Sequence, residues 1–172
     1  MEEIFIKAFR LITCVLLIAW IALIFSMSAQ NATESDKTSG NVIKSVLSVI
    51  YPGFDGLSEE SKAELISSFQ FIARKTAHFS LYAILGLLSF LTVISYRNLK
   101  FGLRTALSAA ICLLYAVSDE VHQLFVPGRS GEIRDVCIDF CGSLLMITIL
   151  ALSARYIKKI YKHVKWVRRN EG

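Results

Sequence analysis

Ionisable side chains gather near the ends of three apolar stretches of this sequence. In the first stretch, Lys75, His78 and Tyr82 are spaced i, i+3, i+7, so on a helix they would share one face. In the second, Asp119 and His122 are i, i+3 neighbours. A histidine beside a carboxylate is the usual arrangement of a general base and the acid that orients it. His78, Asp119 and His122 are therefore candidate catalytic residues.

The other candidate residues lie in the second stretch, in a third stretch, and in the loop between them. Glu120, a fourth candidate catalytic group, and Gln123 lie beside the aspartate–histidine pair. Asp135 and Asp139 are one helical turn apart at the start of the third stretch. Between the two stretches, Arg129 lies in a loop with turn chemistry, where its guanidinium could help to clamp a phosphate or carboxylate. We expect these groups to enclose a shallow polar pocket. Its candidate binding residues are Lys75, Tyr82, Gln123, Arg129, Asp135 and Asp139.

Several chemistries fit these residue types, and the sequence does not choose among them. Two imidazoles and four acids could hold a divalent metal, whose bound water would attack a phosphoester or an amide. The spacing matches no specific ligand set such as HExxH, so the metal and any other cofactor stay unknown. Ser118, one turn from His122, comes nearest to a nucleophile with a base. The alternative is a structural ion-pair network, although ionised groups at the centre of a membrane helix cost about 2.5–3.5 kcal/mol each and usually have a function.

The elements that must position these residues are membrane-spanning helices. Hydrophobic residues make up 54% of the 172 residues, and the mean hydropathy is +0.53. They come in long blocks without proline, each close to the roughly 20 residues that a spanning helix needs. We predict an all-α fold, an integral membrane four-helix bundle with spans at about 9–28, 76–96, 104–125 and 136–155. These spans would form one transmembrane domain, 1–156, followed by a basic cytoplasmic tail, 157–172.

The distribution of basic residues predicts the direction of the helices. Arg97, Lys100 and Arg104 lie between the second and third spans with no acid among them, and further cations follow the fourth span, including Arg168 and Arg169. Positive residues beside short loops stay in the cytoplasm, so we predict both termini inside and the polar residues at the outer face. The tail is either a topology signal or a surface for anionic lipid. Topology thus accounts for the net charge of +5 without nucleic acid as a partner.

The first span has a rival interpretation as a cleaved signal peptide. Small residues at 26–29 resemble a signal-peptidase site, but Glu2 and Glu3 spoil the basic segment that should precede the apolar one. A retained helix is therefore favoured. The four cysteines form no metal-ligand pattern, and we expect them to be small buried apolar side chains.

The connection 28–74 is too long for a plain turn. Apolar residues recur at helical spacing over 41–50, which predicts a short amphipathic helix along the membrane surface. The residues 51–53 should end it. Ser58, followed by two glutamates, is a candidate N-cap for a helix that runs on into the second span.

Two motifs resemble the signature motifs of the VanZ-like membrane proteins. The pattern KxxHFxxYxxLG covers residues 75–86, and SDExHQxFxPGR covers residues 118–129. Asp135, Asp139 and Gly142 continue the second motif, and residues 24–30, followed by Ser39 and Gly40, are similar to the family's weaker first motif. The similarity extends over about residues 11–154 and leaves the basic tail outside it. It contains all ten candidate site residues.

The resemblance implies a multi-pass protein of the bacterial cytoplasmic membrane. The family's name-giving member is associated with low-level resistance to teicoplanin, a glycopeptide antibiotic that binds cell-wall precursors outside the membrane. We therefore expect the pocket to bind or modify a component of the cell envelope. A hydrolase or transferase on a lipid-linked substrate and a lipid- or antibiotic-binding protein without catalysis both stay open. The expected partners are membrane lipids and, through the resemblance, a cell-wall precursor or the antibiotic, and the sequence allows an oligomer.

Overall fold

Five α-helices and one short 3₁₀ turn make up the part of the chain that the computed structural model describes, residues 1–170, with side chains as far as Trp166. The elements are α1 Glu2–Ser28, α2 Ala32–Ile50, η1 Phe54–Gly56, α3 Glu59–Ile94, α4 Phe101–Gln123 and α5 Ile133–Asn170. Four of them, α1, α3, α4 and α5, are long and apolar enough to cross a membrane. The predicted all-α fold with four spanning helices is confirmed. The side chains of Arg168 and Arg169 from the predicted tail lie outside the described residues.

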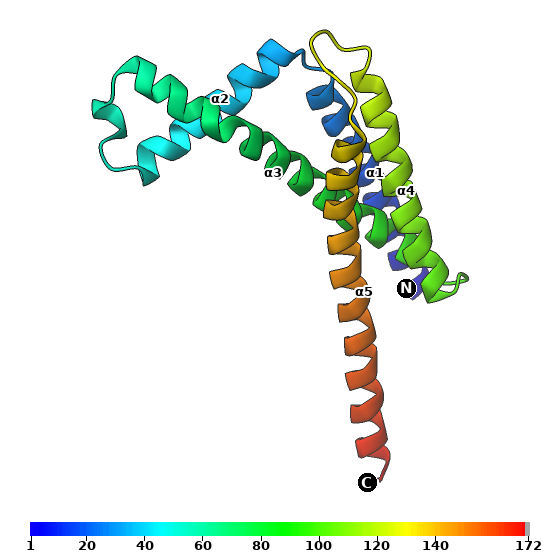
Figure 1. Cartoon of the computed structure of the whole chain (residues 1–172). Helices are drawn as coiled ribbons and strands as arrows, with labels where there is room; N and C mark the ends of the chain where they lie inside the picture. The colour runs from blue at the N-terminus through cyan, green and yellow to red at the C-terminus, as the bar shows by residue number, and fades with distance from the viewer. Residues whose placement is uncertain (171–172) are drawn as a thin grey trace.

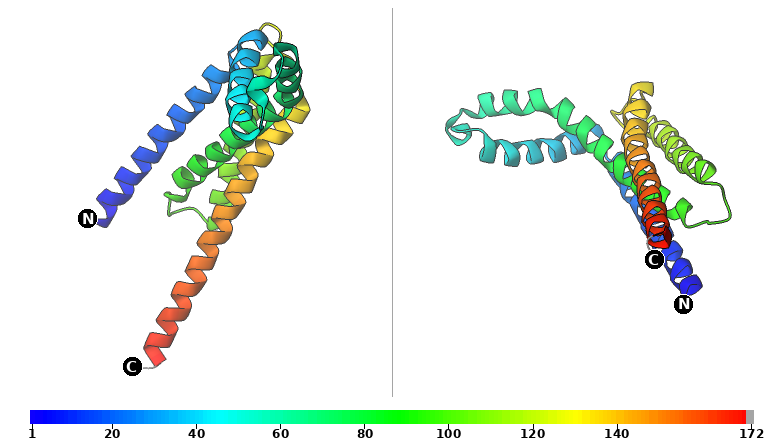
Figure 2. Two further views of the ribbon diagram at one scale, coloured as in Figure 1. Left: turned by 90° about the vertical axis from the view of Figure 1, so that its left-hand side faces the viewer. Right: turned by 90° about the horizontal axis from the view of Figure 1, so that it is seen from below.

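Helix α3 lies at the centre of the bundle. It packs against α1, α4 and α5, and α4 also packs against α5, whereas α1 touches α4 only lightly. Figure 1 shows α3 crossing α5 at a steep angle, and in Figure 2 the last turns of α3 lie between α1 and α5. The core between these helices includes Leu17 and Ile24 of α1, Tyr82 and Leu85 of α3, and Ile147 of α5.

Two glycines let α3 and α5 approach closely. A methyl group at Gly86 would lie 2.5 Å from the carbonyl oxygen of Ser143, and one at Gly142 would collide with the backbone of Phe79. The Oγ of Ser143 also donates a 2.8 Å hydrogen bond to the carbonyl of Tyr82. Small residues and interhelical hydrogen bonds are the usual means by which membrane helices associate, because lipid offers no hydrophobic drive for it.

Helix α1 is fixed to the bundle by two aromatic side chains. The Nε1 of Trp20 in α1 donates to the carbonyl oxygen of Leu81 in α3 at 2.9 Å. The hydroxyl of Tyr115 in α4 donates to the carbonyl oxygen of Ile21 in α1, also at 2.9 Å. Ile24 is almost completely buried in the same interface. Through these contacts α1 packs as one of the helices of the bundle.

Helix α2, η1 and the first half of α3 form a hairpin that we call the arm, and it projects sideways from the bundle (Figure 1). Its own small core contains Ile43, Leu47 and Phe54, packed against Leu65 and Ile66 of α3. This pairing buries one face of α2 against protein.

The prediction of a short helix at 41–50 was wrong in extent, because α2 begins at Ala32. The side chain of Asn31 caps that start by accepting from the backbone N–H of Glu34 at 2.9 Å. The expected N-cap at Ser58 is confirmed, since its Oγ accepts from the N–H of Ser61 and α3 then runs unbroken to Ile94.

The expectation of buried cysteines holds only for Cys112. Cys137 and Cys141 lie exposed on α5, and Cys14 is half-buried on α1. Exposed positions on a spanning helix face hydrocarbon, where a thiol behaves as a small apolar group. All four are free thiols.

The connections between helices divide the molecule into two ends. The links 29–31 and 124–132 and the arm lie at one end, which we call the loop end (Figure 1). The N-terminus, the link 95–100 and the last turns of α5 lie toward the other end. The two motifs, residues 75–86 in α3 and 118–129 at the end of α4, therefore both lie toward the loop end.

Candidate functional site

Three titratable side chains from three different helices meet inside the loop end. His78 of α3, Asp119 of α4 and Asp139 of α5 each offer one ligand-type atom, and these atoms all lie within 4.8 Å of one another. The Nδ1 of His78 is 3.5 Å from a carboxylate oxygen of Asp139. We call these three residues the His–Asp cluster. It gathers one base and two acids into a single volume.

The two aspartates of the cluster are buried with few hydrogen-bond partners. Asp139 is 0% exposed and Asp119 is 2% exposed. One oxygen of Asp119 accepts from the Ser28 hydroxyl at 2.8 Å and from the Tyr82 hydroxyl at 3.2 Å. Its other oxygen, and both oxygens of Asp139, have no hydrogen-bond partner within the described chain. Buried polar atoms are nearly always paired, so atoms left over in this way point to a bound group or to a functional role.

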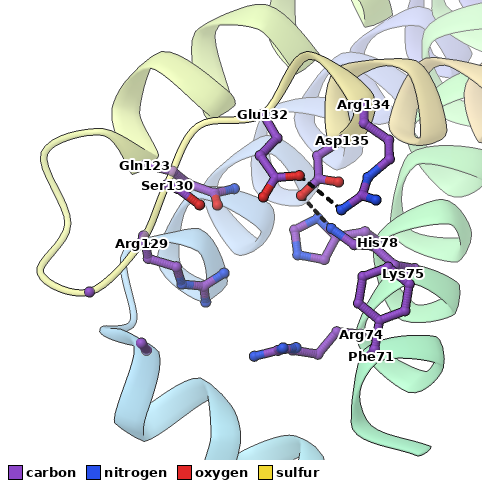
Figure 3. A pocket seen from close by; sticks show the side chains of 12 residues that line it. Phe71, Arg74, Lys75, His78, Gln123, Arg129, Ser130, Glu132, Arg134 and Asp135 are labelled. Atoms are coloured by element: carbon purple, nitrogen blue, oxygen red, sulfur yellow. Dashed lines mark hydrogen bonds and ion pairs between the residues drawn. The ribbon is translucent and has the colours of Figure 1, made fainter.

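A polar cavity of about 240 Å³ opens beside the cluster, with His78 in its wall (Figure 3). The ammonium of Lys75 donates to Asp135, and Arg134 pairs with Glu132 at 2.9 Å. Cations outnumber carboxylates in the lining, which contains Arg74, Lys75, Arg129 and Arg134 against Glu132 and Asp135. Three of these cations are paired with carboxylates, Arg74 with Asp36 among them, so within the described residues Arg129 is the lining cation without an ion pair, and its guanidinium favours an anionic ligand.

The guanidinium groups of Arg129 and Arg74 reach into the cavity from two sides (Figure 3). Arg74 pairs with Asp36 of α2 at 2.5 Å, and the Nε of Arg129 donates to the carbonyl oxygen of Gln30 at 3.2 Å. Burial lowers the pKa of the Arg129 guanidinium from its ordinary value, and the positive charge of Arg74 acts in the same direction. Because an arginine keeps its proton at physiological pH, the cavity contains a partly desolvated cation that an anion would stabilise.

An apolar groove of about 170 Å³ lies next to the polar cavity, between the end of α1, α2 and α3. Val42 and Leu81 are among the apolar side chains that line it. Arg74, His78 and Arg129 border both the groove and the cavity. One ligand could therefore place a charged group in the cavity and an alkyl chain in the groove.

The structure brings eight of the ten predicted site residues to the cluster or to the cavity. They are Lys75, His78, Tyr82, Asp119, Gln123, Arg129, Asp135 and Asp139. The other two have different surroundings. Glu120 accepts the backbone N–H of Glu132 at 2.9 Å and so holds the link 124–132, and His122 stacks on Phe25 of α1 with ring centroids 4.4 Å apart. Glu120 points about 100° away from Asp119 around α4, toward the link 124–132. His122 is only about 60° away from Asp119, but its ring lies against α1.

Sequence reasoning missed two residues that complete the site. Ser28 is the last residue of α1 and donates to Asp119, but the weaker motif around it did not single out one side chain. Arg74 precedes the first motif and lines both spaces, and its partner Asp36 lies in the segment where no helix was predicted. Only the fold of the arm reveals that pairing.

The comparisons with known proteins return one family. The family model described as VanZ/LLP1 matches residues 13–154, which include the His–Asp cluster, the whole of α4, the whole of α3 and more than half of each of α1 and α5. No curated protein and no solved structure matched the chain.

Proposed function

The chain belongs to the VanZ/LLP1 family of membrane proteins, and from this premise we propose that it binds an anionic, lipid-linked component of the bacterial cell envelope at the outer face of the cytoplasmic membrane. The observation that carries the proposal is the junction of the polar cavity with the apolar groove. Arg74, His78 and Arg129 stand at that junction. A phosphate would lie among the guanidinium groups, and its alkyl chain would follow the groove into the bilayer.

The outer location rests on the basic residues at the end opposite the cavity. Arg97 and Lys100 lie in the short link 95–100 there, Arg104 follows in the first turn of α4, and Arg155 with the lysines of the tail lies in the last part of α5. Basic residues beside short links are retained in the cytoplasm, which leaves the loop end outside. Several cations of the loop end are neutralised locally, Arg74 by Asp36 among them. A cavity on that side is accessible to cell-wall precursors and to glycopeptide antibiotics.

Reduced sensitivity to teicoplanin is the expected cellular consequence. A protein that sequesters or alters an envelope component near the antibiotic's target would change how much target is accessible. The partners implied are a membrane lipid or a cell-wall precursor, with the antibiotic's own lipid tail as the other amphiphile of suitable chemistry. In a host that the intact protein protects, Arg129→Gln should reduce protection while the protein level in the membrane is unchanged.

Lipid retention in detergent provides the direct test. Full-length protein is mixed with phosphatidylglycerol or phosphatidylcholine of identical chains, and bound lipid is counted by native mass spectrometry. We expect the anionic lipid to be preferred and Arg129→Gln to weaken its binding about ten- to hundredfold, as a charged hydrogen bond contributes about 1.5–3 kcal/mol. Inorganic phosphate, added as a competitor, separates recognition of the headgroup from recognition of the whole lipid.

Arg97→Gln is the matched control. Arg97 is exposed at the opposite end of the bundle, where it pairs with Glu2 at 2.7 Å. Removing its charge should leave lipid retention unchanged. Equal retention by the wild-type protein and Arg129→Gln, in well-folded preparations, would end the proposal.

A second candidate function, a hydrolase or transferase acting on the same lipid-linked ligand, is favoured by the His78–Asp139 contact. His78 lines the cavity and has a carboxylate oxygen 3.5 Å from its Nδ1, as a general base needs. In that case His78→Gln would abolish formation of product while the lipid still binds. If the protein only binds the lipid, neither the wild-type protein nor His78→Gln would form a product.

A further inference from the structure

We propose that the His–Asp cluster binds one divalent transition-metal ion, zinc or manganese, with His78, Asp119 and Asp139 as its protein ligands. The inference does not depend on lipid binding in the cavity. Four features of the cluster support it. The three ligand atoms lie close together, several carboxylate oxygens have no hydrogen bond, Asp119 is held by two hydroxyl groups, and His78 borders the polar cavity.

The three ligand atoms converge closely enough to share an ion. They come from three helices and lie within 4.8 Å of one another. Zinc bonds to histidine nitrogen and carboxylate oxygen are about 2.0–2.2 Å long, so two ligand atoms of a tetrahedral ion lie about 3.3–3.6 Å apart. The ligand atoms of the cluster would therefore have to draw together by at most about 1.5 Å when an ion binds.

Three carboxylate oxygens of the cluster make no hydrogen bond within the described residues. Both oxygens of Asp139 and one oxygen of Asp119 are buried without a hydrogen bond inside the described chain. Even with His78 protonated, 3.5 Å from Asp139, one imidazolium would face two ionised carboxylates, and the uncompensated negative charge would cost several kcal/mol. Lys75, on the same face of α3, is already paired with Asp135. A divalent cation would neutralise both aspartates at once.

Asp119 is oriented in the manner of a metal ligand. The hydroxyls of Ser28 and Tyr82 both donate to its Oδ2, which leaves Oδ1 free. Metal-binding carboxylates are usually fixed in this way by a second layer of hydrogen bonds. That layer comes from α1 and α3, so all four spanning helices contribute to the site.

The donor set selects the class of metal. One imidazole and two carboxylates suit zinc or manganese, whereas thiolate sites for softer ions are excluded because the cluster contains no cysteine. Three protein ligands leave a fourth position, which is the arrangement of reactive zinc sites. His78 borders the polar cavity, so that open position would face the space where an anion binds.

Metal content of full-length protein tests the proposal. Protein purified in detergent without chelator should contain about one zinc or manganese per chain by elemental analysis. After chelation, adding Zn²⁺ or Mn²⁺ should restore the ion and raise the unfolding temperature, because an ion that binds only the folded state stabilises it. Asp139→Asn and Asp119→Asn should each weaken binding by at least a hundredfold, and Ser28→Ala about ten- to hundredfold.

Two controls keep the test decisive. The double variant Cys137→Ser, Cys141→Ser removes the exposed thiols that could bind zinc adventitiously, and it should retain the ion. If the aspartate variants do not fold, Mn²⁺ bound to wild-type protein should show magnetic coupling to one imidazole nitrogen that persists in His122→Gln. An ion-free wild-type protein with no response to Zn²⁺ or Mn²⁺ overturns the proposal, and so does an ion that both folded asparagine variants retain.

Discussion

Ser28, the last residue of α1, donates a 2.8 Å hydrogen bond from its Oγ to the buried carboxylate of Asp119 in α4. The hydrogen bond of Tyr115 to Ile21 and the stack of His122 on Phe25 also join α4 to α1, but the Ser28 bond is the one that ties the loop end of the first span to the His–Asp cluster. Tyr82 donates to the same oxygen from α3. One buried acid thus joins three helices, and the position of its free oxygen depends on all of them.

Replacing Ser28 by Ala should loosen this connection. We expect a loss of about 1 kcal/mol in the free energy of unfolding, because measured interhelical hydrogen bonds in membranes average about 0.6 kcal/mol and reach about 1.7. Denaturation in mixed micelles measures it. Ser26→Ala is the matched control, since the Ser26 hydroxyl bonds only within its own helix, to the carbonyl oxygen of Leu23. Equal stability of the two variants would contradict the role assigned to Ser28.

A methyl group at Gly86 should separate α3 from α5. The added carbon would lie 2.5 Å from the Ser143 carbonyl oxygen, and forcing extra volume into a packed interface costs about 1–3 kcal/mol. Gly86→Ala should therefore unfold at a lower temperature and should also disturb the cluster, which spans the same two helices. Gly102→Ala, at a helical position with nothing within 4 Å, should be neutral or stabilise by up to about 1 kcal/mol. A Gly86→Ala protein as stable as Gly102→Ala would show that the helices have room to spare.

The sequence predicted the four spans because each is a long apolar block, a signal that hydrocarbon itself imposes. It did not predict the first part of α2. Residues 32–40 are polar and rich in serine and threonine, with no apolar period to indicate a helix. Their helix depends on the Asn31 cap and on contact with α3, where Gly40 lies against Ile66 and Gln70. That contact is made between segments distant in the chain.

The sequence predicted which helices carry the site residues and near which end of each helix they lie. It did not predict the rotation of each helix about its own axis. Spacing put Lys75, His78 and Tyr82 on one stripe, and the structure turns that stripe inward. For α4, the sequence could not tell which of several adjacent polar residues faces the centre. The tilt and rotation of each span decide this, and they are set by packing such as the Gly86 contact with α5.

Glu120 should act through the link 124–132 and not on a ligand directly. Its Oε2 accepts the backbone N–H of Glu132 at 2.9 Å, which fixes the link that carries Arg129. Glu120→Ala should raise hydrogen exchange across this link and weaken retention of phosphatidylglycerol. Glu120→Gln keeps an acceptor oxygen and should retain most of the protection of the link from exchange and most of the lipid binding. If the alanine variant binds lipid normally, the link does not depend on this bond.

The two motif histidines should differ in what their loss does. His78 belongs to the cluster and to the cavity wall, while His122 stacks on Phe25 and its buried Nε2 has no partner within the described chain. His122→Phe preserves the stacked ring and should leave lipid retention and metal content unchanged. His78→Gln should reduce metal binding at least a hundredfold in a protein that still folds. Equal losses in the two variants would mean that His122 also serves the site.

Sidedness is the prediction on which access to the cavity depends. In a chain whose four cysteines are replaced by serine or alanine, Ser130→Cys places a thiol in the exposed link beside Arg129, and Lys100→Cys places one in the link at the opposite end. The basic residues beside the second link predict that it lies in the cytoplasm. A membrane-impermeant maleimide should then label Ser130→Cys on intact spheroplasts. Lys100→Cys should react only after lysis. Labelling of both variants after lysis shows that both thiols can react with the maleimide. The reverse pattern would put the cavity in the cytoplasm, where neither a cell-wall precursor nor teicoplanin could reach it.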